Sequence, residues 1–150
     1  MKRIILGLFC ASLFIVPAAA GTGLVTVESS HSVQVTLDRL TKILTSKGIT
    51  VFARVDHAAG AKKIGKELAP TQLLIFGNPK LGTPLMQSNR TIGIDLPLKA
   101  LAWRDAGGKV WVSYNDPAYL KVRHNISDRD PVFKKITGAL NKLVGKAVSK

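Results

Sequence analysis

Apolar positions change their spacing along the chain, and these changes mark the predicted elements. In residues 33–47, apolar side chains recur at positions 33, 37, 40 and 44, which is the spacing of one helical face. Ser32 stands where an N-cap is needed, and Gly48 stands where a helix ends. The flanking residues 23–28 and 49–55 have the alternation and β-branched content of strands, so the chain begins β-α-β.

A short apolar run, Leu73–Phe76, is predicted to be a strand buried on both faces at the centre of the fold. It stops at Gly77-Asn78-Pro79, because proline lacks the backbone N–H that a sheet ladder needs. Before this run, Asp56 is expected to cap a short helix. After it, Thr83 as the cap and Pro84 as the first helical residue predict a helix over residues 83–89.

The second half of the chain combines strands and turns. We expect a strand over residues 92–96, ended by Pro97, and then a hairpin whose strands are residues 98–104 and 109–114. A short helix and a loop follow in residues 118–129. The last helix is predicted to begin at Asp130-Pro131, with an apolar face at positions 133, 136, 140, 143 and 147 that docks on the sheet.

These elements predict one α+β domain in which a mainly antiparallel sheet packs against helices. Their approximate order is β-α-β-α-β-α-β-β-β-α-α. The sequence shows no internal repeat, linker or low-complexity tract that would divide the domain. We therefore assign residues 21–150 to a single domain of a size that can bury its own core.

The first twenty residues have the pattern of a secretory signal peptide. Met1-Lys2-Arg3 is basic, residues 4–16 are apolar, and Ala18-Ala19-Ala20 forms a small-residue cleavage site. The alternative, a retained anchor, fits less well because the apolar run is shorter than the ~20 residues that span a bilayer. We expect cleavage after Ala20 and a product that is periplasmic or secreted, with no stable transmembrane insertion.

The charge and the single cysteine narrow the possible functions. Without Lys2 and Arg3, the 22 basic residues become 20 against 9 acidic ones, so the net charge falls from +13 to +11. Cys10 lies within the signal, so the mature chain has neither disulfides nor cysteine metal ligands. Such a charge favours anionic partners such as envelope polymers. Nucleic acid is disfavoured, because the lysines are spread out and no aromatic side chains alternate with them.

Several motifs together resemble a known family. They are IFGNP (75–79), GTPLM (82–86), DLPLKALAWRD (95–105) and GKVWVSYNDP (108–117), which are similar to the bacterial and archaeal domain of unknown function 302. The resemblance implies a compact α+β domain with a mainly antiparallel sheet and packed helices, and it is compatible with a homodimer. It implies no activity. Arg104 departs from the acidic residue that similar sequences are expected to carry.

No metal or cofactor site is predicted. The three histidines, His31, His57 and His124, lie in separate segments without a metal-ligand spacing. His57 beside Asp56 could be a ligand that the carboxylate orients, but Asp56 as a helix cap with His57 in the first turn is the simpler interpretation. His124 is expected in an exposed loop. Phosphate-loop and nucleophile-elbow patterns are missing from the sequence.

The candidate ligand site is the end of the central strand, where we expect Asp56, His57, Asn78 and Asp95 to converge. The simpler alternative is that Asp56 caps a helix, Asn78 forms a turn and His57 is solvated. Three functions stay open: a non-enzymatic homodimer that binds a small molecule or an envelope protein, an enzyme that uses Asp56, His57 and Asp95, and a cationic protein on anionic envelope material.

Overall fold

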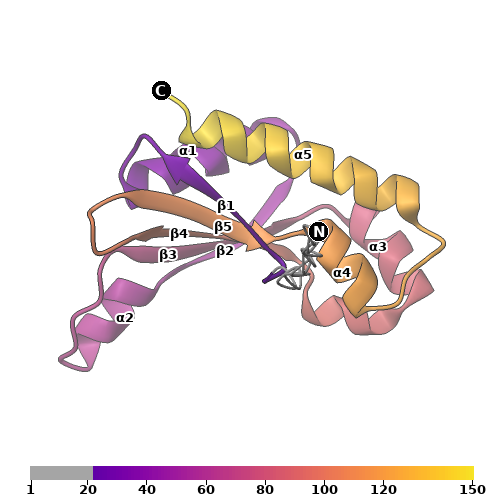
Figure 1. Ribbon diagram of the computed structural model, residues 1–150, viewed down its shortest axis with the longest axis horizontal. Helices are drawn as coiled ribbons and strands as arrows, with labels where there is room; N and C mark the ends of the chain where they lie inside the picture. The colour runs from indigo at the N-terminus through magenta and orange to yellow at the C-terminus, as the bar shows by residue number, and fades with distance from the viewer. Residues whose placement is uncertain (1–21) are drawn as a thin grey trace, which may run out of the picture.

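The computed structural model describes residues 22–150 as a five-stranded antiparallel sheet with two long helices on one face (Figure 1). The predicted signal peptide lies outside the described residues. The strands are β1 (Leu24–Ser29), β2 (Thr50–Asp56), β3 (Thr71–Gly77), β4 (Leu98–Arg104) and β5 (Val110–Asn115). The helices are α1 (Val33–Ser46), α2 (His57–Lys63), α3 (Pro79–Ser88), α4 (Pro117–Arg123) and α5 (Asp130–Val148), and a 3-10 helix, η1, covers Arg90–Ile94. The predicted α+β class is confirmed, and the order of the elements matches the prediction except that η1 stands where a strand was expected over residues 92–96.

The sheet order is β1-β5-β4-β3-β2, and each neighbouring pair is antiparallel. The central strand is therefore β4, and β3 lies between it and the edge strand β2. Leu74 and Phe76 of β3 are buried, whereas Leu73 and Ile75 point to the other face and are only partly buried. The prediction that this strand is central and buried on both faces is wrong, because helices cover only one face of the sheet.

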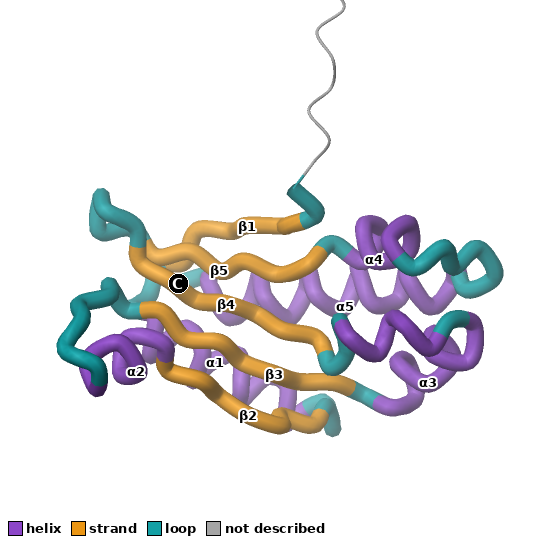
Figure 2. Tube along the Cα trace, turned by 90° about the horizontal axis from the view of Figure 1, so that it is seen from below, coloured by secondary structure: helices purple, strands orange, loops and turns teal. Residues whose placement is uncertain are grey.

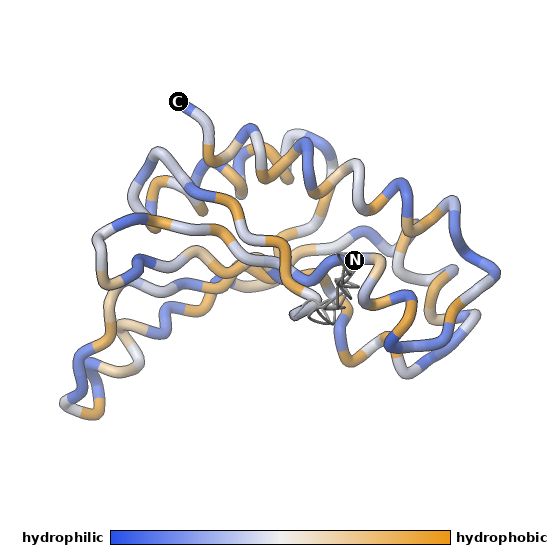
Figure 3. The backbone as a smooth tube through the Cα atoms, in the orientation of Figure 1, coloured by the Kyte–Doolittle hydropathy of each residue, from blue (hydrophilic) through white to orange (hydrophobic). Residues whose placement is uncertain are grey.

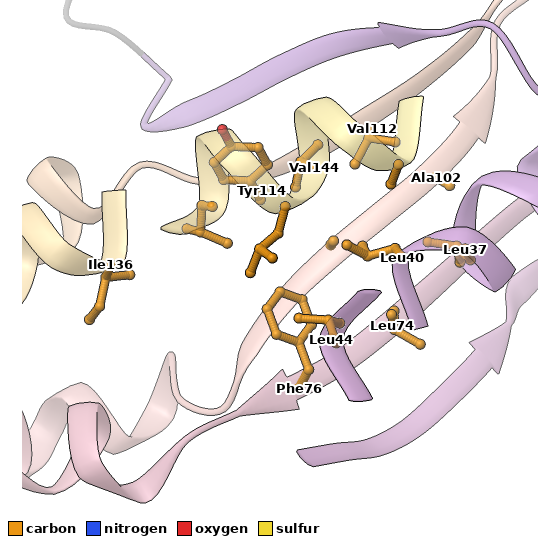
Figure 4. Packing of buried hydrophobic residues seen from close by; sticks show 14 of the residues in the cluster. Leu37, Leu40, Leu44, Leu74, Phe76, Ala102, Val112, Tyr114, Ile136 and Val144 are labelled. Carbon is orange, nitrogen blue, oxygen red and sulfur yellow. The ribbon is translucent and has the colours of Figure 1, made fainter. Parts of the chain in front are cut away.

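The core lies between the sheet and the helices α1 and α5. Figure 4 shows Leu40 and Leu44 of α1 beside Leu74 and Phe76 of β3, with Val144 of α5 close by. Along α5 the trace alternates between hydrophobic and hydrophilic positions (Figure 3), and its predicted apolar face is buried: Phe133, Ile136, Leu140, Leu143 and Ala147. Docking of the last helix is thus confirmed.

Two local predictions differ from the structure. α3 begins at Pro79 and not at Pro84, because Asn78 supplies the cap: its Oδ1 accepts from the Lys80 N–H at 2.9 Å. Residues 92–96 do not form a strand. Asn89 caps η1 there by accepting from the Thr91 N–H, and Ile92 is buried as a local anchor. Both corrections come from asparagine caps that precede the residues used for the prediction.

Within residues 22–150, no helix crosses the face of the sheet opposite α1 and α5 (Figure 2). Val55, Leu73 and Leu101 lie side by side there on β2, β3 and β4. Trp103 and Trp111 form a cross-strand pair, with ring centres 6.5 Å apart and planes at 29°. We call these five residues, together with Ile75, the open sheet face.

Candidate functional site

An apolar cavity of about 290 Å³ lies where β3 ends and β4 begins, between α3 and α5. Its volume is at the small end of the range for ligand pockets, about 300–1,000 Å³. The strands supply Phe52, Phe76, Gly77 and Leu98, and α5 supplies Ile136, Ala139, Leu140 and Leu143. Ile49, Asn78, Pro79, Leu81, Gly82, Thr83, Met86, Leu96 and Pro97 complete the lining.

The lining is apolar because the elements that form it turn their core faces inward. Phe76 and Leu140 belong to the buried core, and the cavity extends that core to the surface. Among residues 22–150, no charged side chain lines the cavity, and Asn78 and Thr83 provide its polar side-chain groups. A cavity of this character stabilises an apolar molecule by removing its surface from water.

Two glycines keep the space open. A Cβ on Gly77 would lie 3.3 Å from Pro97 Cβ and 3.5 Å from Phe52 Cε2, so glycine permits the close packing of these two side chains. A Cβ on Gly82 would lie 3.6 Å from Leu96 Cδ1, in ordinary contact. Gly82 is therefore a position on α3 from which a larger side chain would fill the cavity.

Phe52 lies at the mouth of the cavity. The pairing of β2 with β3 shifts between Val51 and Ala53, which places Phe52 on a β-bulge. Its side chain is 56 % exposed although it contributes to the cavity lining. A large apolar side chain on an irregular edge strand can turn without disturbing the rest of the ladder.

The structure does not bring the four predicted site residues together. Asp56 pairs with Gln72 at the start of β3, whereas Asn78 directly follows the other end of the same strand. The expected convergence is wrong because β2 and β3 are antiparallel, so their ends do not share an edge. Asn78 lines the apolar cavity, and Asp56 and His57 lie at the far end of the sheet.

Asp56 acts as the predicted helix cap. Its Oδ1 accepts from the Ala59 N–H at 2.9 Å, and its Oδ2 accepts from Gln72 Nε2 at 2.9 Å. The hydrogen bond from the Ala59 backbone, followed by that from Gln72, lowers the pKa of Asp56. His57 is the first residue of α2 and is exposed, which agrees with the simpler interpretation of this pair.

A second, more open cavity of about 610 Å³ adjoins α2. Its charged lining residues carry both signs, with Lys62, Lys66 and Arg104 opposed by Asp56 and Glu67. Asp56 is already engaged as a cap and with Gln72. This wide, mixed-charge groove selects no ligand chemistry as clearly as the apolar cavity does.

Asp95 belongs to a hydrogen-bonded cluster that the sequence did not reveal. His124 is 5 % exposed, so its predicted place in an exposed loop is wrong. Its Nε2 lies 2.6 Å from Asp95 Oδ2, and its Nδ1 lies 3.0 Å from Thr91 Oγ1. Arg123 Nε is 3.4 Å from the same carboxylate oxygen. The only advance signal was a histidine after a short helix, which is common and unspecific.

The order hydroxyl–imidazole–carboxylate is also found in nucleophilic catalytic triads. Here the Thr91 hydroxyl donates to Asn89 Oδ1, the cap of η1, and Asn89 Nδ2 donates to the His124 carbonyl. Neither of the two cavities described above is lined by Thr91, Asp95 or His124. The cluster thus joins η1 to the end of α4, and it borders neither of these two cavities.

Among residues 22–150, no group of three or more histidine, aspartate or glutamate side chains is placed to hold a metal ion. Across the same residues, no helix is both long enough and apolar enough to span a membrane.

Comparisons with known proteins give a family, several relatives and a fold. The family model described as "Domain of unknown function DUF302" matches residues 25–143. Two similar curated proteins, each 59 % identical over 105 residues, are named "Fluoride-specific ion channel FluC 1" and come from Brucella suis and Brucella abortus. The match covers 70 % of this chain but only 41 % and 39 % of those proteins, so the chain spans about two fifths of their length.

The crystal structure of an uncharacterized conserved protein DUF302 from Bacillus stearothermophilus has the same fold, with a TM-score of 0.68. The alignment covers 85 % of this chain and 97 % of that one at 22 % identity.

Proposed function

The chain belongs to the family described as domain of unknown function DUF302, and we propose that this member is a non-enzymatic protein that binds a small apolar molecule. The observation that carries the proposal is the cavity of about 290 Å³ between α3 and α5, whose lining has no charged side chain. Ligand pockets are concave and mostly apolar, with a few polar groups that set orientation. Asn78 is such a group, and it was one of the four residues expected to bind a ligand.

The absence of acid–base groups from the cavity lining favours binding over catalysis. A reaction that moves protons needs a titratable side chain within hydrogen-bond reach of the substrate. Asp56, His57 and Asp95, the residues of the enzymatic alternative, are not part of this lining. Asp56 serves α2 as its cap, and Asp95 is held by His124 and Arg123.

The test uses N-phenyl-1-naphthylamine, an uncharged dye whose fluorescence rises in apolar surroundings. Wild-type protein should bind it with saturation, and Gly82→Leu should abolish binding because the new side chain fills the cavity. Gly138→Leu is the matched control, since it makes the same change on α5 where a Cβ would meet nothing within 4 Å. Equal binding by wild type and Gly82→Leu would contradict the proposal.

We also propose that two copies associate through the open sheet face. Val55 is 39 % exposed, and Leu73, Ile75, Leu101 and the two tryptophans continue the apolar surface beside it. The chain is strongly basic, yet Lys109 is paired with Glu28 at the margin of this face. A dimer formed here would bury apolar area and leave most lysines in solvent.

We further propose that the protein is exported. The signal-like residues 1–20 support secretion or a periplasmic location after cleavage at Ala20. The basic charge would then face anionic envelope material, which is the weaker alternative function. The name of a fluoride-specific ion channel belongs to the longer Brucella proteins, and we assign no channel activity to this chain on that basis.

A further inference from the structure

The polar side-chain groups that line the apolar cavity are the amide of Asn78 and the hydroxyl of Thr83. Within residues 22–150, a hydrogen bond holds the side chain of Asn78 in place and none holds that of Thr83. Asn78 Oδ1 accepts from the Lys80 N–H at 2.9 Å, which identifies the oxygen and fixes the side chain by its cap role. The Nδ2 group of Asn78 makes no hydrogen bond to residues 22–150, and it lies at a solvent-accessible position of the lining, because no buried side-chain nitrogen or oxygen among these residues lacks a partner. An amide NH₂ group provides two donors and no acceptor.

The lining also constrains the charge of the ligand. Transferring an ionised group from water into apolar surroundings is costly unless an opposite charge accompanies it. In the part of the chain that the structure describes, no lysine, arginine, histidine, aspartate or glutamate lines this cavity. A carboxylate or an ammonium group inside it would have no counter-charge, so an uncharged molecule fits and an ionised one does not.

We propose that the ligand is an uncharged molecule with an aliphatic or aromatic body and one carbonyl oxygen, which accepts a hydrogen bond from Asn78 Nδ2. The inference rests on the proposed binding function and adds the chemical class of the ligand and its polar anchor. A ketone, an aldehyde, an ester or an amide has the required acceptor. The small volume of about 290 Å³ limits the body to a short chain or one or two rings.

The aromatic side chains agree with this ligand class. Phe76 is 3 % exposed and forms part of the inner wall, whereas Phe52 is at the mouth on its β-bulge. An apolar body would contact Phe76 and Leu140, and Phe52 would close over it. Because Asn78 lies at the junction of β3 and α3, the carbonyl is anchored near the edge of the cavity and the body extends inward.

The experiment compares displacement of the naphthylamine dye by 2-nonanone and by nonane, which replaces the carbonyl with a methylene group. Each affinity is divided by the compound's partition coefficient from water into an apolar solvent, because the hydrocarbon leaves water more readily than the ketone. On this scale the ketone should bind roughly three- to tenfold more tightly, as expected for one hydrogen bond. Nonanoate at neutral pH should compete much less well than either. Equal affinities for the ketone and the hydrocarbon would overturn the inference while leaving the binding function intact.

Asn78→Asp provides the decisive variant. Aspartate is as good an N-cap as asparagine and still accepts from the Lys80 N–H, so α3 should form normally. The carboxylate has no donor and repels a carbonyl oxygen. The variant should therefore lose the preference for 2-nonanone, while nonane changes by less than about threefold because its binding depends on apolar burial.

Thr83→Val is the matched control, because it removes the other polar side chain of the lining at nearly constant volume. It should retain the ketone preference. A preference that survives Asn78→Asp but disappears in Thr83→Val would overturn the assignment to Asn78. Failure of wild type to bind either compound or the dye would instead overturn the proposed function itself, as would occupation of the cavity by residues 1–20 or by a second copy.

Discussion

His124 Nε2 lies 2.6 Å from Asp95 Oδ2, and this contact joins the end of α4 to the end of η1. The two residues are 29 positions apart, and both side chains are nearly buried, at 5 % and 11 % exposure. A buried carboxylate needs a hydrogen-bond partner, because it has lost the water molecules that would otherwise hydrate its charge. We therefore interpret the pair as the tie that holds these two connecting segments together.

The His124→Ala variant should be destabilised. Removing the imidazole deprives Asp95 and Thr91 of a partner, and loss of a hydrogen bond to a charged group costs about 1.5–3 kcal/mol. Urea unfolding would measure the difference. His57→Ala is the control, because His57 is exposed and its loss should stay within about 0.5 kcal/mol. Equal midpoints for the two variants would show that the tie contributes nothing.

The sequence predicted local features of the fold well. Ser32 and Asp56 cap their helices as expected, because a cap depends on residues within one turn. The apolar face of α5 was visible for the same reason, since its period is internal to the helix. The hairpin with strands over residues 98–104 and 109–114 was predicted for the same reason, and its register places Trp103 opposite Trp111.

The candidate site was harder to predict because its parts are distant in the sequence. Asp56 and Asn78 separate once β2 and β3 run in opposite directions, and no local pattern states which ends of two strands meet. The cavity forms between α3, α5 and the strand ends, so its existence depends on packing. The burial of His124 likewise follows from its pairing with Asp95.

Two glycines with left-handed backbone should respond differently to substitution by alanine. Gly23 has φ +71° and Gly48 has φ +67°, so both variants incur backbone strain. At Gly23 the added Cβ would also lie 2.5 Å from Tyr119 Cγ, whereas at Gly48 it meets nothing within 4 Å. Thermal unfolding should show a larger loss for Gly23→Ala. Equal losses would mean that Tyr119 moves aside without cost.

The Asp56 cap should make part of the stability depend on pH. The pKa of Asp56 in the folded protein lies below the ordinary value of an aspartate carboxyl group, mainly because of the hydrogen bond from the Ala59 backbone. A lowered folded pKa gives a contribution that is present above the unfolded pKa and is lost as pH falls through the folded one. Comparison with Asp56→Asn, which keeps a capping oxygen, isolates this dependence.

The difference in unfolding free energy between wild type and Asp56→Asn should therefore be constant near neutral pH. As the pH falls below about 4, the carboxylate of the unfolded chain begins to bind protons, so wild type should lose stability relative to Asp56→Asn. Urea midpoints at a series of pH values would show this. A difference that is the same at every pH would mean that the charge of Asp56 has no role in the cap.

The last prediction concerns association through the open sheet face. Leu101 occupies the central strand β4, between Leu73 on one side and Ser113 on the other. An arginine at this position would place a charge in the middle of an interface that excludes water, which strongly disfavours association. Leu101→Arg should therefore convert a wild-type dimer into a monomer in light scattering after gel filtration.

Val122→Arg is the matched control for this change. Val122 is 78 % exposed on α4, away from the open sheet face, so the same gain of charge there should leave the oligomeric state unchanged. Circular dichroism of both variants would show that they are folded, because neither side chain belongs to the core between the sheet and the helices. A monomeric wild type, or a dimer that persists in Leu101→Arg, would rule out this face as the interface.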